Sequence, residues 1–252
     1  MKLPNYKLGV LYPTANVGHL HGQTGKRPDC NDNFQLSHGN HPLDSLIQSA
    51  KANGGRLVFT LNRIWPEKNI ELLIEGIAYF LNHYENGERK KPFHAVIAGS
   101  VAQRFPEALS YYKYLRNLTD QLDLNRHITF LLSPNEAEKE ALFRASDVVV
   151  YPPKDEHFGI FPVESMQYGK ICISDDSGGP RETVLNHVTG LRMNFSDPAT
   201  MADCLNRILN RRRMKIVSKA DELYRRQNEK FTFSSFSQQT VGIVNQLFFS
   251  DI

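Results

Sequence analysis

The chain has 252 residues, of which 40% are hydrophobic and 23% are charged, and its formal net charge is +3. These values are typical of a globular protein with one sizeable core, and the near-neutral charge does not favour a nucleic-acid partner. Three widely spaced cysteines do not form a disulfide framework, and no apolar run approaches the length of a membrane span, so we expect a protein of a reducing compartment.

The first 55 residues are rich in Gly, His, Asn and Pro and show no sustained periodicity. We expect an irregular connector or tail over 1–55. Its histidines match no zinc-ligand spacing, so no metal site is predicted there. Basic runs at 88–91 and 211–215 fit either solvated surface or contact with an acidic membrane surface or a phosphate-bearing acceptor.

From Arg56 onward, short apolar runs alternate with longer segments of helical periodicity. Runs that are apolar on both faces are typical of strands in a parallel sheet covered by helices. The predicted strands are 57–61, 94–98, 128–132, 148–151 and 171–173. Apolar stripes between them predict helices after Lys68, from Pro106 and around Leu142, and Asp197-Pro198 marks the start of another.

This alternation predicts an α/β fold with a Rossmann-like, doubly wound parallel sheet. We assign the nucleotide-binding domain to 56–212 and expect 213–252 to form a helical segment that packs on it. In such sheets, ligands bind beyond the carboxyl ends of the strands, so the residues after each strand are the candidates for chemistry.

Arg63 and Lys68 flank a tight loop after the first predicted strand, where a helix opens. Fixed positive charge and free backbone N–H groups at that place suit a diphosphate. The helix dipole disfavours a cation at a helix N-terminus, so a lysine there suggests an anionic partner or ligand. Taken alone, the pattern fits a phosphate site and ordinary surface charge equally well.

Glu156 and Glu164 flank a glycine after the fourth predicted strand. Gly159 permits close approach of a ligand to the backbone, and a helix starting near Phe158 turns its first N–H groups toward the crevice. Glu164 is suited to the two adjacent hydroxyls of a ribose, and Glu156 to those of a sugar. Alternatively, Glu164 is a solvent-facing helix residue. Its apolar neighbours argue against an exposed position.

Gly178 and Gly179 lie in a turn after the fifth predicted strand, and such a turn can direct N–H groups at an anion. The chain has no G-x-G-x-x-G after its first strand, no P-loop and no Asp-x-Asp at a strand end. These absences weigh against nicotinamide and simple ATP binding and against a metal.

In order and spacing, three segments resemble the C-terminal donor domain of GT-B-fold retaining glycosyltransferases. They run from Asn62-Arg63 to Lys68-Asn69, from Glu156 to Glu164, and from Ser177-Gly178-Gly179-Pro180 to Glu182. Within that family they are most similar to the eukaryotic α-1,3/1,6-mannosyltransferases of the dolichol pathway. The resemblance is strong over about 56–209 and thin at both ends.

The resemblance implies that Arg63 and Lys68 contact the diphosphate of GDP-mannose, that Glu164 holds the ribose and that Glu156 holds the transferred sugar. Backbone near Phe158, Gly159, Gly178 and Gly179 would line the donor. It also implies catalysis without a metal or other cofactor, with retention of configuration, a lipid-linked oligosaccharide as acceptor, and a peripheral place on the cytosolic face of the endoplasmic reticulum membrane.

The same resemblance implies a second, N-terminal acceptor domain that has no counterpart in these 252 residues. Two alternatives therefore stay open. The chain is a non-catalytic nucleotide-sugar-binding module or partner of a full-length transferase, or it belongs to a related transferase that uses a UDP-sugar.

Overall fold

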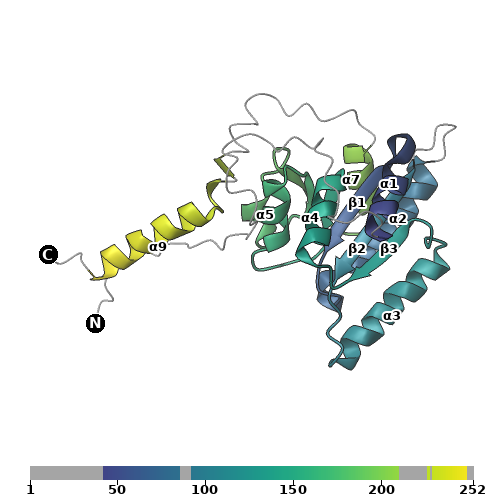
Figure 1. Ribbon diagram of the computed structural model, residues 1–252, viewed down its shortest axis with the longest axis horizontal. Coiled ribbons are helices and arrows are strands. Elements are labelled where there is room, and N and C mark those ends of the chain that lie inside the picture. Colours follow the sequence, from purple (N-terminus) through teal and green to yellow (C-terminus); the bar gives the residue numbers. More distant parts are fainter. Residues whose placement is uncertain (1–41, 86–91, 210–225, 228, 249–252) are drawn as a thin grey trace.

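The computed structural model describes residues 42–85, 92–209, 226–227 and 229–248. Within them, six parallel strands form one sheet in the order β3-β2-β1-β4-β5-β6 (Figure 1). The strands are β1 (Arg56–Leu61), β2 (Phe93–Gly99), β3 (Ile128–Leu132), β4 (Val148–Tyr151), β5 (Cys172–Asp175) and β6 (Gly190–Met193).

Helices precede, connect and follow the strands. They are α1 (Pro42–Lys51), α2 (Ile70–Tyr84), α3 (Pro106–Gln121), α4 (Glu136–Ala145), α5 (Ile160–Gln167), α6 (Pro180–Thr183), α7 (Pro198–Leu209) and α9 (Phe233–Phe248), with short 3-10 turns η1 (Ala52–Gly54) and η2 (Pro66–Lys68). The predicted Rossmann-like, doubly wound fold is confirmed.

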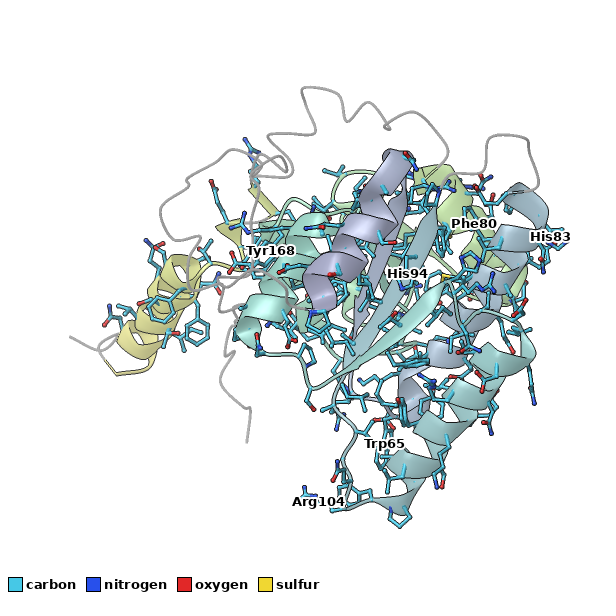
Figure 2. All side chains as sticks on the ribbon, turned by 45° about the vertical axis from the view of Figure 1, so that its right-hand side comes forward. Trp65, Phe80, His83, His94, Arg104 and Tyr168 are labelled. Atoms are coloured by element: carbon cyan, nitrogen blue, oxygen red, sulfur yellow. The ribbon has the colours of Figure 1, made fainter. Side chains whose placement is uncertain are left out.

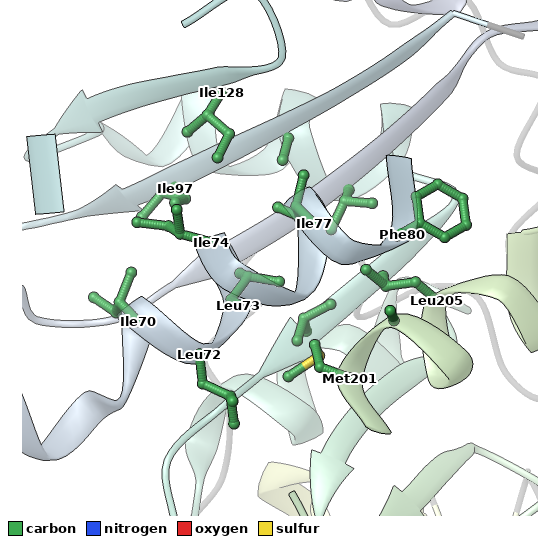
Figure 3. Packing of buried hydrophobic residues seen from close by; sticks show 14 of the residues in the cluster. Ile70, Leu72, Leu73, Ile74, Ile77, Phe80, Ile97, Ile128, Met201 and Leu205 are labelled. Atoms are coloured by element: carbon green, nitrogen blue, oxygen red, sulfur yellow. The ribbon is translucent and has the colours of Figure 1, made fainter. Parts of the chain in front are cut away.

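Each face of the sheet has its own core, because successive strand side chains point to opposite faces. Val58 of β1 packs with α2, α3 and α7, whereas Phe59 packs with α1, α4 and α5. Figure 3 shows the first core, in which Ile74 and Ile77 of α2 lie beneath the strands and Met201 and Leu205 of α7 lie on the other side of that helix. Burial on both faces explains why the strand sequences read as continuous apolar runs.

The helix α1 corrects the expectation that 1–55 is irregular. Leu43 and Ala50 of this helix are buried against the second core, and Lys51 forms an ion pair with Asp147 at 2.6 Å. Asp147 also accepts a hydrogen bond from the backbone N–H of Leu57 at 2.7 Å, which ties α1 to the sheet. Residues 1–41 lie outside the described part of the chain.

The C-terminal segment corrects a second expectation. A helix is present over Phe233–Phe248, as predicted, but it projects away from the sheet instead of packing on it (Figure 1). The residues just before that helix do contact the domain. Phe231 is buried in the second core, and the Gln227 side chain donates a hydrogen bond to the Glu182 carbonyl at 2.6 Å. The basic runs at 88–91 and 211–215 fall on residues that the structure does not describe.

Candidate functional site

The strand order places a topological switch point between β1 and β4. The chain continues from β1 toward β2 and β3 on one side, and from β4 toward β5 and β6 on the other. The loops that leave β1 and β4 therefore diverge and leave a crevice at the carboxyl edge of the sheet, where ligands of this fold bind. Figure 2 shows Trp65 and Arg104, from the loops after β1 and β2, together at one end of the domain, far from Phe80 and His83.

Lys68 and Glu156 meet across this switch point. Lys68 ends η2 in the loop after β1, and its Nζ pairs with the carboxylate of Glu156 in the loop after β4. The side chains are only 12% and 21% exposed, so the pair lies largely out of solvent. Asn69, the next residue, reinforces the junction because its side chain donates to the Pro152 carbonyl at 3.3 Å.

The electrostatics of the pair keep Glu156 charged. Burial acts to raise the pKa of Glu156, but the hydrogen bond and the charge of Lys68, together with a hydrogen bond from Tyr151, hold that pKa below its usual value. Burial and the neighbouring Glu156 raise the pKa of Tyr151, which keeps its hydroxyl protonated as a donor. The loops after β1 and β4 thus bring one half-buried cation and one half-buried anion into contact.

Arg63 lies apart from this pair. Its guanidinium is 3.7 Å from Glu67 in the same loop, and its side chain is 69% exposed. Its charge is nevertheless felt by Tyr151, whose pKa it acts to lower. Arg63 is therefore at the same edge of the sheet as Lys68, on a side chain with room to move toward an anion.

The two glycine-containing loops fit together without space between them. The Gly179 N–H donates to the Glu156 carbonyl at 2.6 Å, and the Asp155 N–H donates to the Ser177 hydroxyl at 2.8 Å. Gly178 adopts a left-handed conformation (φ +52°), and a Cβ there would be 2.3 Å from the Glu156 carbonyl oxygen. The turn around Gly178 thus shapes the loop that carries Glu156, and the Gly179 N–H is already engaged within the protein.

Gly159 is the N-cap of α5 and has a left-handed backbone (φ +80°), where a Cβ would lie 3.0 Å from the Tyr151 ring. The helix starts at Ile160, two residues after the predicted start near Phe158. The ring of Phe158 packs edge-on against buried Phe231. The loop between β4 and α5 is therefore held by the glycine turn and by the C-terminal segment.

Glu164 lies in the second turn of α5 and is buried, which excludes the alternative of a solvent-facing residue. Its carboxylate is 2.9 Å from the Nζ of Lys139 in α4. Burial raises the pKa of Glu164 above its usual value, while Lys139 acts to lower it. Sequence reasoning missed Lys139, although a lysine in the first turn of a predicted helix carries the same unfavourable dipole signal that singled out Lys68.

Asp175 and Asp176, at the carboxyl end of β5, have a structural role. Asp175 is buried and accepts a hydrogen bond from the Phe195 N–H at 2.8 Å, and Asp176 lies 3.5 Å from both Arg181 and Arg192. Among the described residues, no three His, Cys, Asp or Glu side chains are grouped as a metal site requires. No helix in that part of the chain is long and apolar enough to cross a bilayer.

A Rossmann-like sheet with charged residues meeting at its switch point is typical of domains that bind nucleotides. Residues 44–229 match the family described as glycosyl transferases group 1, and the chain belongs to that family. This assignment confirms the glycosyltransferase class predicted from the three motifs.

Curated relatives refine the comparison. The chain is 29% identical to the α-1,3/1,6-mannosyltransferase ALG2 of Mus musculus, over 94% of this chain and 52% of the relative. It is 29% identical to ALG2 of Dictyostelium discoideum, over 94% of this chain and 55% of the relative. The chain thus spans about half the length of these relatives.

Solved structures share the fold. A sucrose-phosphate synthase from Thermosynechococcus elongatus superposes with a TM-score of 0.64 at 22% identity, covering 78% of this chain and 46% of that one. Anabaena HepE in complex with UDP and glucose superposes with a TM-score of 0.63 at 20% identity, covering 82% and 53%. In both, the matched part is about half of a larger chain.

Proposed function

We propose that this chain is the donor-binding half of a retaining mannosyltransferase that uses GDP-mannose and a dolichol-linked oligosaccharide. The observation that supports it most directly is the half-buried Lys68–Glu156 pair across the β1/β4 switch point, in a chain similar to ALG2 over nearly its whole length. One wall of the crevice offers positive charge for a diphosphate, and the other offers a carboxylate for sugar hydroxyls.

Each predicted residue has a place in this proposal. Lys68 and Arg63 contact the diphosphate, Glu156 binds hydroxyls of the mannose, and Glu164 binds the ribose. Backbone at Phe158, Gly159, Gly178 and Gly179 lines the donor, with Gly178 and Gly179 acting also through the shape of the Glu156 loop.

The chemistry centres on the leaving group. When the bond between the mannose C1 and the β-phosphate oxygen breaks, negative charge grows on the GDP, and pre-placed cations stabilise it most where water is excluded. Lys68 is largely buried and supplies such a charge. No metal or other cofactor enters the proposal, because two cations and a helix N-terminus supply the positive potential.

Titration calorimetry with GDP, GDP-mannose and UDP tests the proposal. We expect saturable binding of GDP and GDP-mannose, with UDP weaker. Absence of binding at millimolar ligand by a protein whose circular dichroism shows it folded would disprove it, and a clear UDP preference would instead support the UDP-sugar alternative.

Variants then locate the site. Lys68→Ala and Glu164→Ala should each weaken GDP-mannose binding by at least about 1 kcal/mol, the scale of a lost charged hydrogen bond. Lys113→Ala, a charge change at an exposed position of α3, serves as the matched control and should bind normally. Unchanged affinity in both site variants would place the donor elsewhere.

The same proposal includes a lipid-linked acceptor, a location at the membrane and turnover of the donor. A peripheral site on the cytosolic face of the endoplasmic reticulum membrane follows from the similarity to ALG2 and from the expected lipid-linked acceptor. Turnover of GDP-mannose by the chain alone, with a lipid-linked oligosaccharide, would exclude the reading as a non-catalytic module.

A further inference from the structure

The ion pair between Lys139 and Glu164 joins two helices at the ligand-binding edge of the sheet. Lys139 Nζ is 2.9 Å from Glu164 Oε1, and the side chains are only 18% and 11% exposed. Both helices begin at the carboxyl edge, since α4 follows β3 and α5 follows β4. Because β4 borders the switch point, Glu164 lies on the helix that leaves it, and the pair is separate from the Lys68–Glu156 pair.

The N-terminal cap of α4 fixes the position of Lys139. Asn135 caps α4 in a reciprocal capping box with Glu138, at 2.9 Å and 2.8 Å, which sets where the helix starts and which way its first turn faces. A lysine in that first turn opposes the helix dipole, so its position needs an anionic partner. Glu136 lies 3.4 Å away but is 85% exposed, whereas Glu164 is buried and is the stronger partner.

We propose that Lys139 is a positioning residue of the nucleoside subsite, which holds the Glu164 carboxylate ionised and oriented to accept hydrogen bonds from the ribose hydroxyls. This inference rests on the proposed function, in which Glu164 binds the ribose. Lys139 itself makes no contact with the ligand and acts only through Glu164. Its role therefore requires a ribose and disappears for a ligand that lacks the ribose hydroxyls.

The surroundings of Glu164 predict how the site responds to pH. Burial raises the pKa of Glu164. Of the charged groups that face it, Lys139 acts to lower that pKa and Glu136 acts to raise it. Tyr168, directly after α5, stays protonated because burial raises its pKa to about 12. Removing Lys139 therefore moves the pKa of Glu164 further up. Protonation then removes an anionic acceptor, so ribose binding weakens as the pH falls.

The test uses calorimetry on the full chain with GDP and with 2′,3′-dideoxy-GDP. Lys139→Met should weaken GDP binding about fivefold at pH 7, with the loss growing toward pH 6 and shrinking toward pH 8.5, relative to the wild-type profile. The same variant should bind 2′,3′-dideoxy-GDP as the wild type does. Lys139→Arg should restore most of the GDP affinity, and Lys113→Met controls for the change in net charge.

A double variant separates positioning from simple loss of fold. Glu164→Gln should weaken GDP binding with no added pH dependence, and Lys139→Met combined with Glu164→Gln should bind GDP as Glu164→Gln alone, because Lys139 acts through Glu164. This double variant leaves no unpaired buried charge, so it stays informative if Lys139→Met alone unfolds.

Several results would overturn the inference. The first is that Lys139→Met binds GDP as tightly as the wild type at every pH. The second is that Lys139→Met loses as much affinity for 2′,3′-dideoxy-GDP as for GDP. The third is that the double variant binds GDP several-fold more weakly than Glu164→Gln alone. Failure of the wild type to bind GDP would instead refute the proposed function, so the two failures are distinguishable.

Discussion

A methyl group added at Gly179 would lie 2.3 Å from both Cα and the carbonyl oxygen of Phe158, which are backbone atoms that cannot rotate away. Gly179→Ala should therefore push the turn off the loop that carries Glu156 and destabilise the fold by about 1–3 kcal/mol. Donor affinity should fall as well, because the Gly179 N–H would lose its bond to the Glu156 carbonyl. Thermal unfolding and calorimetry measure both effects.

Gly242→Ala is the control for that substitution, since a Cβ at Gly242 of α9 meets nothing within 4 Å. Its stability should be unchanged or slightly higher, as alanine favours a helix. If Gly179→Ala were as stable as Gly242→Ala and bound GDP normally, the fit between the two loops would not matter to the site.

Single residues differ in how far the sequence predicts them. Lys68 stands out as a cation at a helix start and Glu156 as a carboxylate beside a glycine turn, both in loops at the carboxyl ends of strands, and the strand order then brings them together. Lys139 carries only the dipole signal of a lysine near a helix start, and within a polar helix that signal looks like ordinary surface charge. What distinguishes it is a partner 25 residues later, and only tertiary packing of α4 beside α5 provides that partner.

At the scale of elements, helices α2 and α7 pack closely through Gly76 and Met201. A Cβ on Gly76 would lie 2.4 Å from the Met201 Cγ, and Figure 3 shows Met201 pointing at α2. Met201→Ala should cost about 2–5 kcal/mol by leaving a cavity. Gly76→Ala should destabilise the wild type and cost less in the Met201→Ala background, because the clash with the Met201 Cγ is removed while the Cβ of residue 201 still lies 2.7 Å from the added methyl.

Chemical denaturation of the four proteins in this cycle measures the coupling. Equal effects of Gly76→Ala in both backgrounds would mean that the two helices do not meet where the structure places them. The unfolding slope should stay constant across the set, so that differences in midpoint report stability alone.

The elements that sequence reasoning missed are short or hidden by their neighbours. In α1, residues 43, 46, 47 and 50 form an apolar stripe at helical spacing that predicts a helix, but the Gly- and His-rich residues before it suggest an irregular segment. The strand β6 has four residues, of which two are buried, and its apolar run is too short to separate from a turn. It becomes a strand because β5 offers it a free edge.

At the scale of the whole molecule, the strand order decides where the site is. Alternating strands and helices predict a doubly wound sheet, and the rule for such sheets then brings the loops after β1 and β4 together without any knowledge of side-chain contacts. No comparable rule predicts where the C-terminal helix lies. Its sequence is compatible both with packing on the domain and with projection from it. The structure shows that α9 projects and that Phe231 holds the segment.

Because Phe231 is packed in the core and α9 is not, two changes in the C-terminal segment should affect stability differently. Phe231 is buried beside Phe158, so Phe231→Ala should cost about 3–5 kcal/mol and lower the melting temperature by several degrees. Removing the residues after Thr232 deletes α9, whose Phe233 and Val241 are largely exposed, and should change stability by less than about 1 kcal/mol.

Calorimetric unfolding of the two proteins compares them directly, and donor titration adds a second readout. Because the Phe158 ring contacts Phe231 and the Phe158 backbone contacts Gly179, loss of the phenyl ring should also loosen the loop that carries Glu156 and weaken donor binding. The truncated chain should keep its affinity. A truncated chain as unstable as Phe231→Ala would show instead that α9 contributes to the folded domain.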